Sequence, residues 1–527
     1  MANPIMAAPV TSLRNWFRRD VERPLEDAVG GRLRLKVVVL LACVLSLDAA
    51  DEATVGAVAA PLKEALRIGN IQVGYLVTAS TAVGIFVTLP FGALADRMHR
   101  NRLLVATIAG WSIAMLVGGF SSSYGMLLLS RLALGVAVAA AVPVTASLTG
   151  DYFQPHERGR IYSYMLAGEL LGVAAGFLLS GNLAALLSWR GAFWVLGAAG
   201  LVLAFVIWRK LPEPVRGGSL GLGRSMPVAT DQAAGNGGGT ARAEPIGATS
   251  KSAKNDVEKK VEARHVAAHE VLVLDRDPAA LPLWTAVRYI LSIRTYRTLV
   301  LASALGYFYF AGLRTFAIVF MRERFGLDQA LASTLSVGLG LGAIVGALLA
   351  GFIADRLIQH EHLVGRVAVA AAAFFTASAA FLPSLLTTSL AFAAPFFFIA
   401  AAGLGGANPA VDAARLDVMH SRLWGRAEGV RATLRFALTA IAPPLFGYVA
   451  DVFGGPPAGA PGGSAPGMDA LGLDRAFLIM LVPLAFAGLL LLRAARTYTR
   501  DVATAVASEH ATERHRRAQH AGPATRG

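Results

Sequence analysis

Long apolar runs dominate this chain of 527 residues. Charged or Gly/Pro-rich breaks divide it into six runs, a polar gap and six further runs. Each run holds about 20 residues or more, enough for a helix to cross roughly 30 Å of hydrocarbon. The runs lack the strict alternation of outer-membrane strands, so the pattern predicts helices. The predicted spans are 35–60, 71–95, 102–121, 124–150, 159–186, 189–209, 297–321, 328–354, 364–383, 385–413, 427–450 and 474–495.

This pattern predicts an all-α membrane protein with twelve transmembrane helices in two pseudo-symmetric six-helix bundles. The predicted segments are a cytoplasmic N-terminal segment (1–34), an N-terminal bundle (35–211), a cytoplasmic linker (212–295), a C-terminal bundle (296–496) and a cytoplasmic tail (497–527). Residues 212–280 are rich in Gly, Ala, Ser, Lys and Glu, a composition that cannot bury a core, so we predict disorder there. Residues 281–293 predict a short helix at the membrane surface.

A short signature occurs once in each half of the chain. Residues 92–97 read GALADR and residues 351–356 read GFIADR, each where an apolar run gives way to a charged turn. Two copies of one helix-turn signature indicate a duplicated bundle. Duplicated bundles are typical of carriers that rock one half against the other around a central site.

Lys and Arg outnumber Asp and Glu by 48 to 34, which gives a net charge of +14. In a soluble protein this would suggest nucleic acid, but here the charges gather between apolar runs, so we expect no nucleic-acid partner. Predicted cytoplasmic loops hold Arg97, Arg100, Arg102, Arg158, Arg160, Arg209, Lys210, Arg356, Arg366, Arg415, Arg422 and Arg426, and predicted outer loops hold only Lys63, Arg67, Arg190, Arg322, Arg324 and Arg475. This asymmetry predicts a multi-pass protein with both termini in the cytoplasm. The Ala/Arg/Gly-rich, Lys-poor composition is typical of a GC-rich bacterial genome. A bacterial source in turn predicts the plasma membrane as the location.

Several kinds of chemistry are disfavoured by residues that the chain lacks. Cys43 is the single cysteine, so neither a disulfide nor a cysteine metal site is available. No Gly-Lys-Ser/Thr phosphate loop occurs, which disfavours ATP-driven transport. We therefore expect no cofactor, no metal and no enzymatic activity.

Two motifs resemble those of the major facilitator superfamily. Residues 92–102 resemble its signature between helices 2 and 3, with His99 at a glycine position, and Arg131 followed by Gly135 resembles its helix 4 motif. The resemblance covers all predicted spans and implies transport by alternating access. The acids of the first span and residues 427–429 and 443–447 also resemble Spinster-like lipid transporters. Glu52 and Val138 differ from that subfamily's usual residues, so its substrate is not carried over.

Three carboxylates, Asp48, Asp51 and Glu52, lie deep in the first predicted span. Their spacing places them on one helical face, and ionised groups at this depth are costly, which favours a functional role. Arg131 lies at a depth similar to that of Asp51, so the two can pair. We predict that these four residues, with Glu169 of the fifth span, couple protons to transport. The alternative is that the acids only pair with Arg131 and hold the bundle together.

Substrate binding is predicted for the seventh span. Arg314 could attract an anionic group there, and Tyr307 and Phe310 supply aromatic surface. Aromatic side chains on this span and on the tenth favour an amphipathic or aromatic solute over a sugar. Arg314 and Glu169 could instead be satisfied structural partners.

Gating is predicted for the repeated signature and the predicted cytoplasmic ends of the tenth and eleventh spans. By family resemblance, Asp96 closes a latch against the start of the eleventh span, near Arg431, and Asp355 is its counterpart beside the fifth span. The full predicted gating set is Asp96, Arg97, Asp355, Arg356, Asp412 and Arg431. Glycines every fourth residue in 168–176 and 338–346 let another helix approach closely. The family resemblance implies that this contact lies between the two halves, and the alternative is packing within one bundle, which uses the same pattern.

These features together predict a proton-coupled secondary transporter that works as a monomer in the lipid bilayer. We expect it to export or flip amphipathic small molecules, such as drugs or lysolipids. The alternative is a proton-linked uptake permease for an organic anion, in which Arg314 binds the substrate carboxylate. A transceptor or scaffold acting through the linker is a further alternative.

Overall fold

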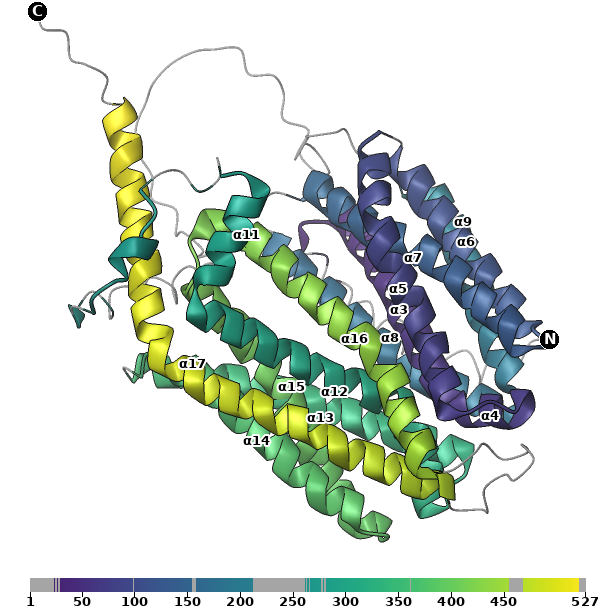
Figure 1. Cartoon of the computed structure of the whole chain (residues 1–527). Helices are drawn as coiled ribbons and strands as arrows, with labels where there is room; N and C mark the ends of the chain where they lie inside the picture. The colour runs from purple at the N-terminus through teal and green to yellow at the C-terminus, as the bar shows by residue number, and fades with distance from the viewer. Residues whose placement is uncertain are drawn as a thin grey trace, which may run out of the picture.

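The computed structural model describes residues 29–97, 99–153, 158–211, 266–275, 281–360, 362–454 and 468–520, together with a few isolated positions before and within the linker. Side chains within some helical stretches, 84–98 among them, lie outside this description. The described chain is helical throughout and contains no strand (Figure 1). The fold is therefore all-α, as the apolar runs predict.

The helices before residue 211 form what we call the first helical group. They are α3 (Arg32–Ala57), α4 (Ala59–Leu66), α5 (Asn70–Arg97), α6 (Arg100–Gly119), α7 (Tyr124–Tyr152), α8 (Arg158–Leu186) and α9 (Trp189–Lys210). The predicted span 35–60 is too long at its end, because α3 stops at Ala57. Pro61 explains the break: in one continuous helix its ring would clash with the carbonyl of residue 57.

The later helices form the second helical group, α12 to α17. They are α12 (Arg294–Phe325), α13 (Gln329–Gln359), α14 (Gly365–Leu386), α15 (Leu390–Asp417), α16 (Trp424–Gly454) and α17 (Met468–His520), with α11 (Leu283–Ser292) before them and short 3-10 turns at Glu270–Leu272 and Ser421–Leu423. Helix α11 occupies the segment predicted as a short surface helix. Its Leu283 and Trp284 are exposed, whereas Ala286 and Ile290 are buried.

Helices of each group pack mainly on one another, α3 with α8 and α6 with α9 in the first, α14 with α15 and α12 with α17 in the second. The groups meet where α5 contacts α16, α8 contacts α13, and α3 contacts α12. Helix α4 lies at one end of this assembly and α11 at the opposite end (Figure 1). We call these the α4 end and the α11 end.

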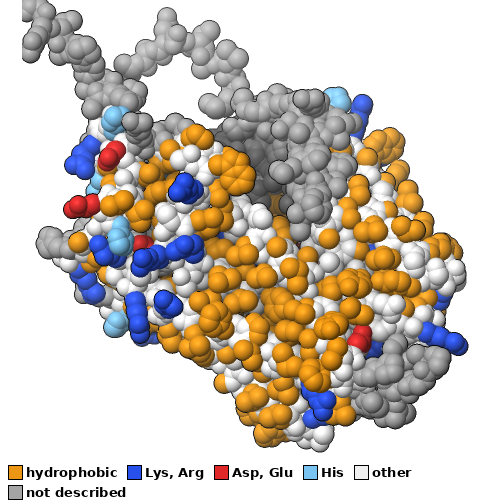
Figure 2. All heavy atoms as spheres, in the orientation of Figure 1, with side chains coloured by type: hydrophobic (Ala, Val, Ile, Leu, Met, Phe, Trp, Pro, Cys, Tyr) orange, Lys and Arg blue, Asp and Glu red, His pale blue; other side chains and the backbone are white. Residues whose placement is uncertain are grey.

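The surface between the two ends is apolar. Hydrophobic side chains cover most of the middle of the face in Figure 2, and many of the basic side chains gather around the outer part of α17. Within the described residues, nine helices are long and apolar enough to cross a membrane. The molecule therefore has the hydrophobic belt of a multi-pass membrane protein.

Helix α17 continues well past the predicted span 474–495. Its 53 residues reach His520, through most of the predicted tail. Part of the predicted linker packs along this extension: the His269 backbone N–H donates to Thr504 Oγ1 (2.9 Å) and that of Leu274 donates to Ser508 Oγ (3.1 Å). Residues 266–275 therefore have a fixed place, contrary to the disorder predicted across 212–280.

The two glycine strips pack inside the groups rather than between them. A Cβ on Gly172 would lie 2.2 Å from the carbonyl oxygen of Ser46 in α3, and one on Gly346 would lie 1.8 Å from that of Ala402 in α15. The prediction that these strips form the contact between the halves is therefore wrong for these positions. The close contact of α8 with α13 uses Gly181 and Ser333 instead.

Candidate functional site

The pair of Asp51 and Arg131 lies inside the first helical group. Asp51 is six residues before the end of α3 and Arg131 seven residues after the start of α7, so both reach the same depth. Arg131 Nη1 donates to Asp51 Oδ1 (2.6 Å) and Nη2 donates to Oδ2 (3.1 Å). Asp51 is 1% exposed and Arg131 is 2% exposed. This two-pronged ion pair matches the pairing that depth along the helices predicts.

Glu52, the next residue of α3, has a different partner. Its carboxylate pairs with Nη1 of Arg314 on α12, so this ion pair joins the first group to the second. The Glu52 side chain is 42% exposed and that of Arg314 is 13% exposed, which makes the pair far more open than Asp51–Arg131. Arg314 Nε is buried without a hydrogen-bond partner among the described residues. Glu52 therefore leaves donor capacity on Arg314 unused.

Asp48 and Glu169 complete a set of acids at this level of the interface. Asp48 interacts electrostatically with Glu52, Asp51, Glu169 and Arg314. Glu169 on α8 is exposed and interacts electrostatically with Glu52, with Arg314 and with Arg435 on α16. Carboxylates of the first group thus face arginines of the second. The predicted proton-coupling residues lie close together, although they divide between the group interior and the interface.

Arg435 lies beside the predicted substrate residue Tyr307. Its guanidinium carbon is 5.0 Å from the centre of the Tyr307 ring and 4.8 Å from that of Phe436. Tyr307 and Arg314 are seven residues apart on α12 and therefore share a helix face. Phe310 is exposed on the same helix. Arg435 lies one turn beyond Arg431 on α16 and also interacts electrostatically with Glu428.

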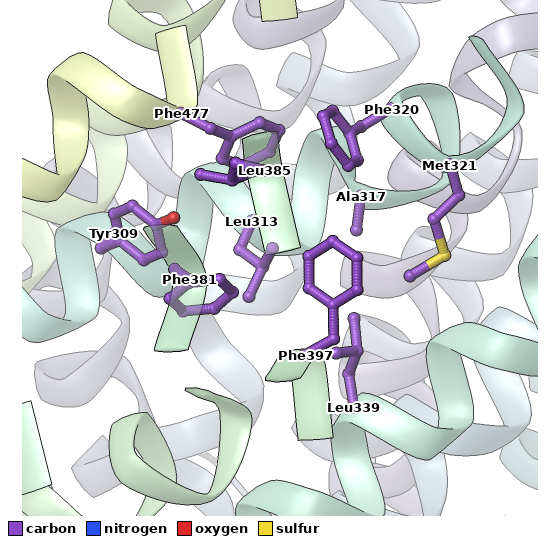
Figure 3. A pocket seen from close by; sticks show the side chains of 10 residues that line it. All are labelled: Tyr309, Leu313, Ala317, Phe320, Met321, Leu339, Phe381, Leu385, Phe397 and Phe477. Carbon is purple, nitrogen blue, oxygen red and sulfur yellow. The ribbon is translucent and has the colours of Figure 1, made fainter. Parts of the chain in front are cut away.

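A large aromatic cluster lies within the second group. Ten residues surround a small internal pocket there (Figure 3): Tyr309, Leu313, Ala317, Phe320, Met321, Leu339, Phe381, Leu385, Phe397 and Phe477. Tyr309, Phe381 and Phe477 are almost completely buried. These side chains form a packed core that stiffens the second group, so they do not line a path between the two groups.

Contacts between the two groups concentrate at the α4 end. Asp451 of α16 accepts hydrogen bonds from the backbone N–H groups of Asn70 (3.0 Å) and Ile71 (2.9 Å), at the start of α5. A Cβ on Gly74 would lie 2.5 Å from the backbone of Pro443, so α5 and α16 touch directly. Further polar contacts across the groups there are Lys63–Glu323 (3.3 Å), Arg322–Glu64 (3.5 Å) and Thr78 Oγ1 to the Ala440 carbonyl (2.5 Å). The two groups are therefore closed against each other at this end.

The ion pairs that the described residues form toward the α11 end lie inside the second group. Arg431 pairs with Asp412 (3.1 Å) and Glu428 (2.6 Å), and Arg415 bridges to the same two acids. This network joins α15 to α16, both of the second group. Asp412 and Arg431, both of the predicted gating set, do meet, but their described contacts do not connect one group to the other.

The repeated signature lies at the α11 ends of α5 and α13. Asp96 and Arg97 are the last two residues of α5, and Arg356 is an exposed residue in the last turn of α13. The side chains of Asp96, Arg97 and Asp355 lie outside the described part of the chain. Their predicted gating role stays a prediction.

Sequence reasoning assigned no role to two acidic residues of α16. Asp451 caps α5 from a helix almost 400 positions away in sequence, and no local pattern indicates such a partner. Glu428 lies three residues before Arg431, a spacing typical of a helical ion pair, and this signal was available.

The match to a known family follows from the sequence as a whole. The sequence model of the Major Facilitator Superfamily matches residues 41–443, so the chain belongs to that family. Together with its curated relatives, this makes the protein a multi-pass membrane transporter and not an enzyme. The family-level resemblance carried by the two motifs is thereby confirmed.

Its relatives include several carriers of organic acids. The 4-hydroxybenzoate transporter PcaK of Pseudomonas aeruginosa is 30% identical over 181 residues, 34% of this chain and 40% of that protein. The D-galactonate transporter of Escherichia coli is 25% identical over 343 residues, 65% of this chain and 72% of that protein. The gallate transporter of Pseudomonas putida is 26% identical over 217 residues, 41% of this chain and 46% of that protein. The chain thus matches less than half the length of the two aromatic-acid carriers.

Solved structures share the fold. A bacterial homologue of the human lysosomal transporter Spinster, in an inward-facing and unoccupied conformation, has a TM-score of 0.71 at 20% identity, covering 89% of this chain and 98% of that chain. Its inward-facing and occupied conformation has a TM-score of 0.70. The Spinster-like resemblance therefore extends to the three-dimensional fold.

Proposed function

We propose that this transporter is a proton-linked uptake permease for an organic anion in the bacterial plasma membrane. Twelve transmembrane helices in two six-helix halves form it, with the α11 end and both termini in the cytoplasm. The observation that carries the proposal is the charge arrangement at the interface. Acids of the first group, Glu52, Asp48 and Glu169, face Arg314 and Arg435 of the second group.

This arrangement suits a carrier that binds an anion and a proton together. Arg314 is neutralised by Glu52 in the structure described here. A proton on Glu52 removes its negative charge and frees the guanidinium for a substrate carboxylate, which can use both edges of the planar group. Protonation and anion binding therefore favour each other. The carrier loaded with one proton and one negative charge of the substrate has the same net charge as the empty carrier.

The closed α4 end fits the same cycle. The α4 end faces the outside in this proposal, so the state in which that end is closed opens to the cytoplasm. Substrate and proton leave there. Breaking the contacts around Asp451 and Lys63 opens the outer side. Glu52–Arg314 is one of the bonds that must break, so its occupancy by proton or substrate is linked to the movement of the two groups.

The buried pair Asp51–Arg131 has a supporting part in this cycle. It fixes α3 against α7 and so holds Glu52 and Asp48 at the interface. Separation of a buried ion pair is costly, which keeps this pair intact while the groups rock. The proton-coupling role that the sequence predicts for Asp51 and Arg131 stays a prediction.

Uptake of an organic anion is better supported than export of amphipathic compounds. Relatives that carry 4-hydroxybenzoate, gallate and D-galactonate all have acidic substrates by name. The interface offers two arginines to an anion, whereas the large aromatic cluster is sealed inside the second group. Export of drugs or lysolipids stays a second candidate without a specific feature that favours it.

Proteoliposomes containing the purified protein test the proposal. Radiolabelled 4-hydroxybenzoate, gallate and D-galactonate are offered outside while the lumen is made alkaline relative to the medium. We expect at least one of the three to accumulate, and a protonophore to abolish the accumulation. Equal uptake with and without the pH gradient would contradict proton coupling, and no uptake of any acid would contradict the substrate class.

A further inference from the structure

Arg435 is held in an unusual setting for a charged side chain of this interface. It lies on α16, and the nearby Arg431 of α16 and Arg415 of α15 are engaged by Asp412 and Glu428. No carboxylate among the described residues forms an ion pair with Arg435, and its described contacts are the rings of Tyr307 and Phe436. Arg435 interacts electrostatically with Glu428 and Glu169, but neither carboxylate forms an ion pair with its N–H donors among the described residues.

The geometry of these contacts determines what Arg435 can still bind. Both ring centres lie within the distance at which a cation is attracted to an aromatic face. Rings engage the faces of a guanidinium, whereas its five N–H donors point outward in its plane. Tyr307 and Phe436 thus attract the guanidinium without supplying a negative charge, so its N–H donors can still bind a carboxylate.

Arg435 also lies close enough to the central acids to belong to the same site. Its charge interacts with that of Glu169 on α8 of the first group, which in turn interacts with Glu52 and Arg314. Tyr307 connects the two arginines, since it contacts Arg435 and shares a face of α12 with Arg314. Seven residues along a helix correspond to about 10 Å, close to the length of a small aromatic acid.

On the basis of the proposed function, we propose that Arg435, Tyr307 and Phe436 form the docking site for an aromatic carboxylate while Glu52 is paired with Arg314. The carboxylate binds the free edge of Arg435, and the ring of the acid packs on Tyr307. Aromatic packing of this kind gives a preference for ring-bearing acids over aliphatic ones. Arg314 becomes a second anchor only after Glu52 releases it.

Binding to the purified protein in detergent tests this assignment, with 4-hydroxybenzoate and D-galactonate as probes and calorimetry as the readout. Arg435→Gln should weaken 4-hydroxybenzoate binding about 10- to 100-fold, the loss expected when a charge-assisted hydrogen-bonded partner is removed. Arg297→Gln is the matched control, because it removes an exposed arginine of α12 at the α11 end. It should bind like the parent protein.

Tyr307 separates an aromatic docking site from a general anion site. Tyr307→Phe should retain affinity for 4-hydroxybenzoate, whereas Tyr307→Leu should lose it several-fold with little change for D-galactonate. Arg435→Lys keeps the charge without the planar stack and should bind between the parent protein and Arg435→Gln. Thermal unfolding of each variant shows that it is folded, and the Tyr307 pair carries the test if Arg435→Gln is not.

The outcomes distinguish this inference from the proposed function. If the parent protein binds either acid and Arg435→Gln binds it equally well, the docking site is wrong and the anion permease stands. Binding of D-galactonate alone has the same consequence, as does an equal loss of both acids in Tyr307→Leu. If the parent protein binds no organic anion, the proposed function fails and the docking site with it.

Discussion

Two adjacent residues of α3 form ion pairs in regions that behave differently: one pair lies inside the fixed first group, and the other crosses the interface that moves. Asp51 points into the first helical group and is held by both terminal nitrogens of Arg131, out of contact with solvent. Glu52 points to the interface and holds one nitrogen of Arg314 in a partly open setting. The same chemistry thus serves two purposes. Burial makes one pair a permanent brace, and exposure makes the other a bond that can break.

The two ends of the interface show a similar contrast. At the α4 end, ion pairs and the Asp451 cap connect one group to the other. Toward the α11 end, the pairs of Arg415 and Arg431 stay within the second group. A rocking carrier closes one end at a time, so the location of the crossing bonds identifies the end that is closed.

The largest effect is expected from breaking the brace. Arg131→Gln leaves the Asp51 carboxylate buried without a cation, a change that costs about 3–5 kcal/mol in proteins. We expect a clear fall in Tm of the purified protein and low yield of folded carrier. Arg314→Gln should lower Tm much less, because Glu52 remains accessible to solvent.

The double variant Asp51→Asn with Arg131→Gln sharpens this contrast. It removes both charges, so Tm should recover part of what Arg131→Gln alone loses. Equal Tm values for Arg131→Gln and Arg314→Gln would show that Asp51–Arg131 is no stronger a brace than the interfacial pair.

The next effect concerns the movable pair. Glu52→Gln keeps the side-chain length but cannot carry a negative charge, so Arg314 is free whatever the pH. Accumulation driven by a pH gradient should collapse to simple equilibration, while exchange of labelled for unlabelled substrate continues. Glu64→Gln is the control, because Glu64 is 72% exposed and contributes little through its pair with Arg322. Undiminished accumulation in Glu52→Gln would remove Glu52 from the coupling role.

Asp451→Asn loosens the closed α4 end. The variant loses the negative charge at the start of α5, and charge-assisted bonds are roughly twice as strong as neutral ones. A loss of about 1–2 kcal/mol shifts a two-state balance roughly 5- to 30-fold, so the outer side should open more often. Maleimide labelling of Ser333→Cys, in a Cys43→Ser background, reports this because Ser333 is buried against Gly181.

Glu64→Gln again provides the matched control at this end. Its exposed pair also crosses between the groups, and labelling of Ser333→Cys should barely change. If Asp451→Asn labels no faster than Glu64→Gln, the cap on α5 does not hold the end closed.

Asp96→Asn is expected to act in the opposite direction and more weakly. Asp96 ends α5 at the α11 end, and its predicted part is to close that end. The substitution should shift the resting balance toward the state closed at the α4 end, so Ser333→Cys labels more slowly and turnover falls with little change in binding. Unchanged labelling at both ends would remove Asp96 from the gate.

Sequence reasoning succeeded where distance along a helix decides the outcome. The apolar runs place Asp51 and Arg131 nine and seven residues from their ends, and the helices place them six and seven residues away, so their pairing was predictable. The same method fails for Glu52 and Arg314, which lie 5 and 11 residues from their helix ends. Helix α12 has 32 residues and extends past α3, where Glu323 meets Lys63. Contacts between the two groups depend on how they sit together, which no local pattern records.

The gating cluster shows a second limit. Asp412 and Arg431 were predicted together because both lie near the ends of their spans, and they do pair. Depth alone cannot tell a contact within one group from a contact across two. Arg435 shares the helix of Arg431 but is one turn further along, and that turn places it against Tyr307 rather than beside Asp412. The direction in which each side chain leaves the helix therefore determines whether the arginine forms a structural ion pair, as Arg431 does, or can bind substrate, as proposed for Arg435.

The smallest effect is expected from the linker. Its segment 212–260 contains the run Gly-Asn-Gly-Gly-Gly at 235–239 and lies outside the described residues, whereas 266–275 packs against α17. Replacing 218–258 with about 12 Gly and Ser residues leaves about 20 residues between Leu211 and Val261, with a typical reach of about 25 Å. Transport should persist at the parent rate, measured in the same proteoliposomes. A longer replacement that also removes 266–275 is the contrasting variant, since it strips α17 of its partner and should lower Tm. If the shorter replacement folds and inserts but does not transport, the linker regulates the carrier. The interface between the groups and the Asp51–Arg131 pair would then not account for how transport is controlled.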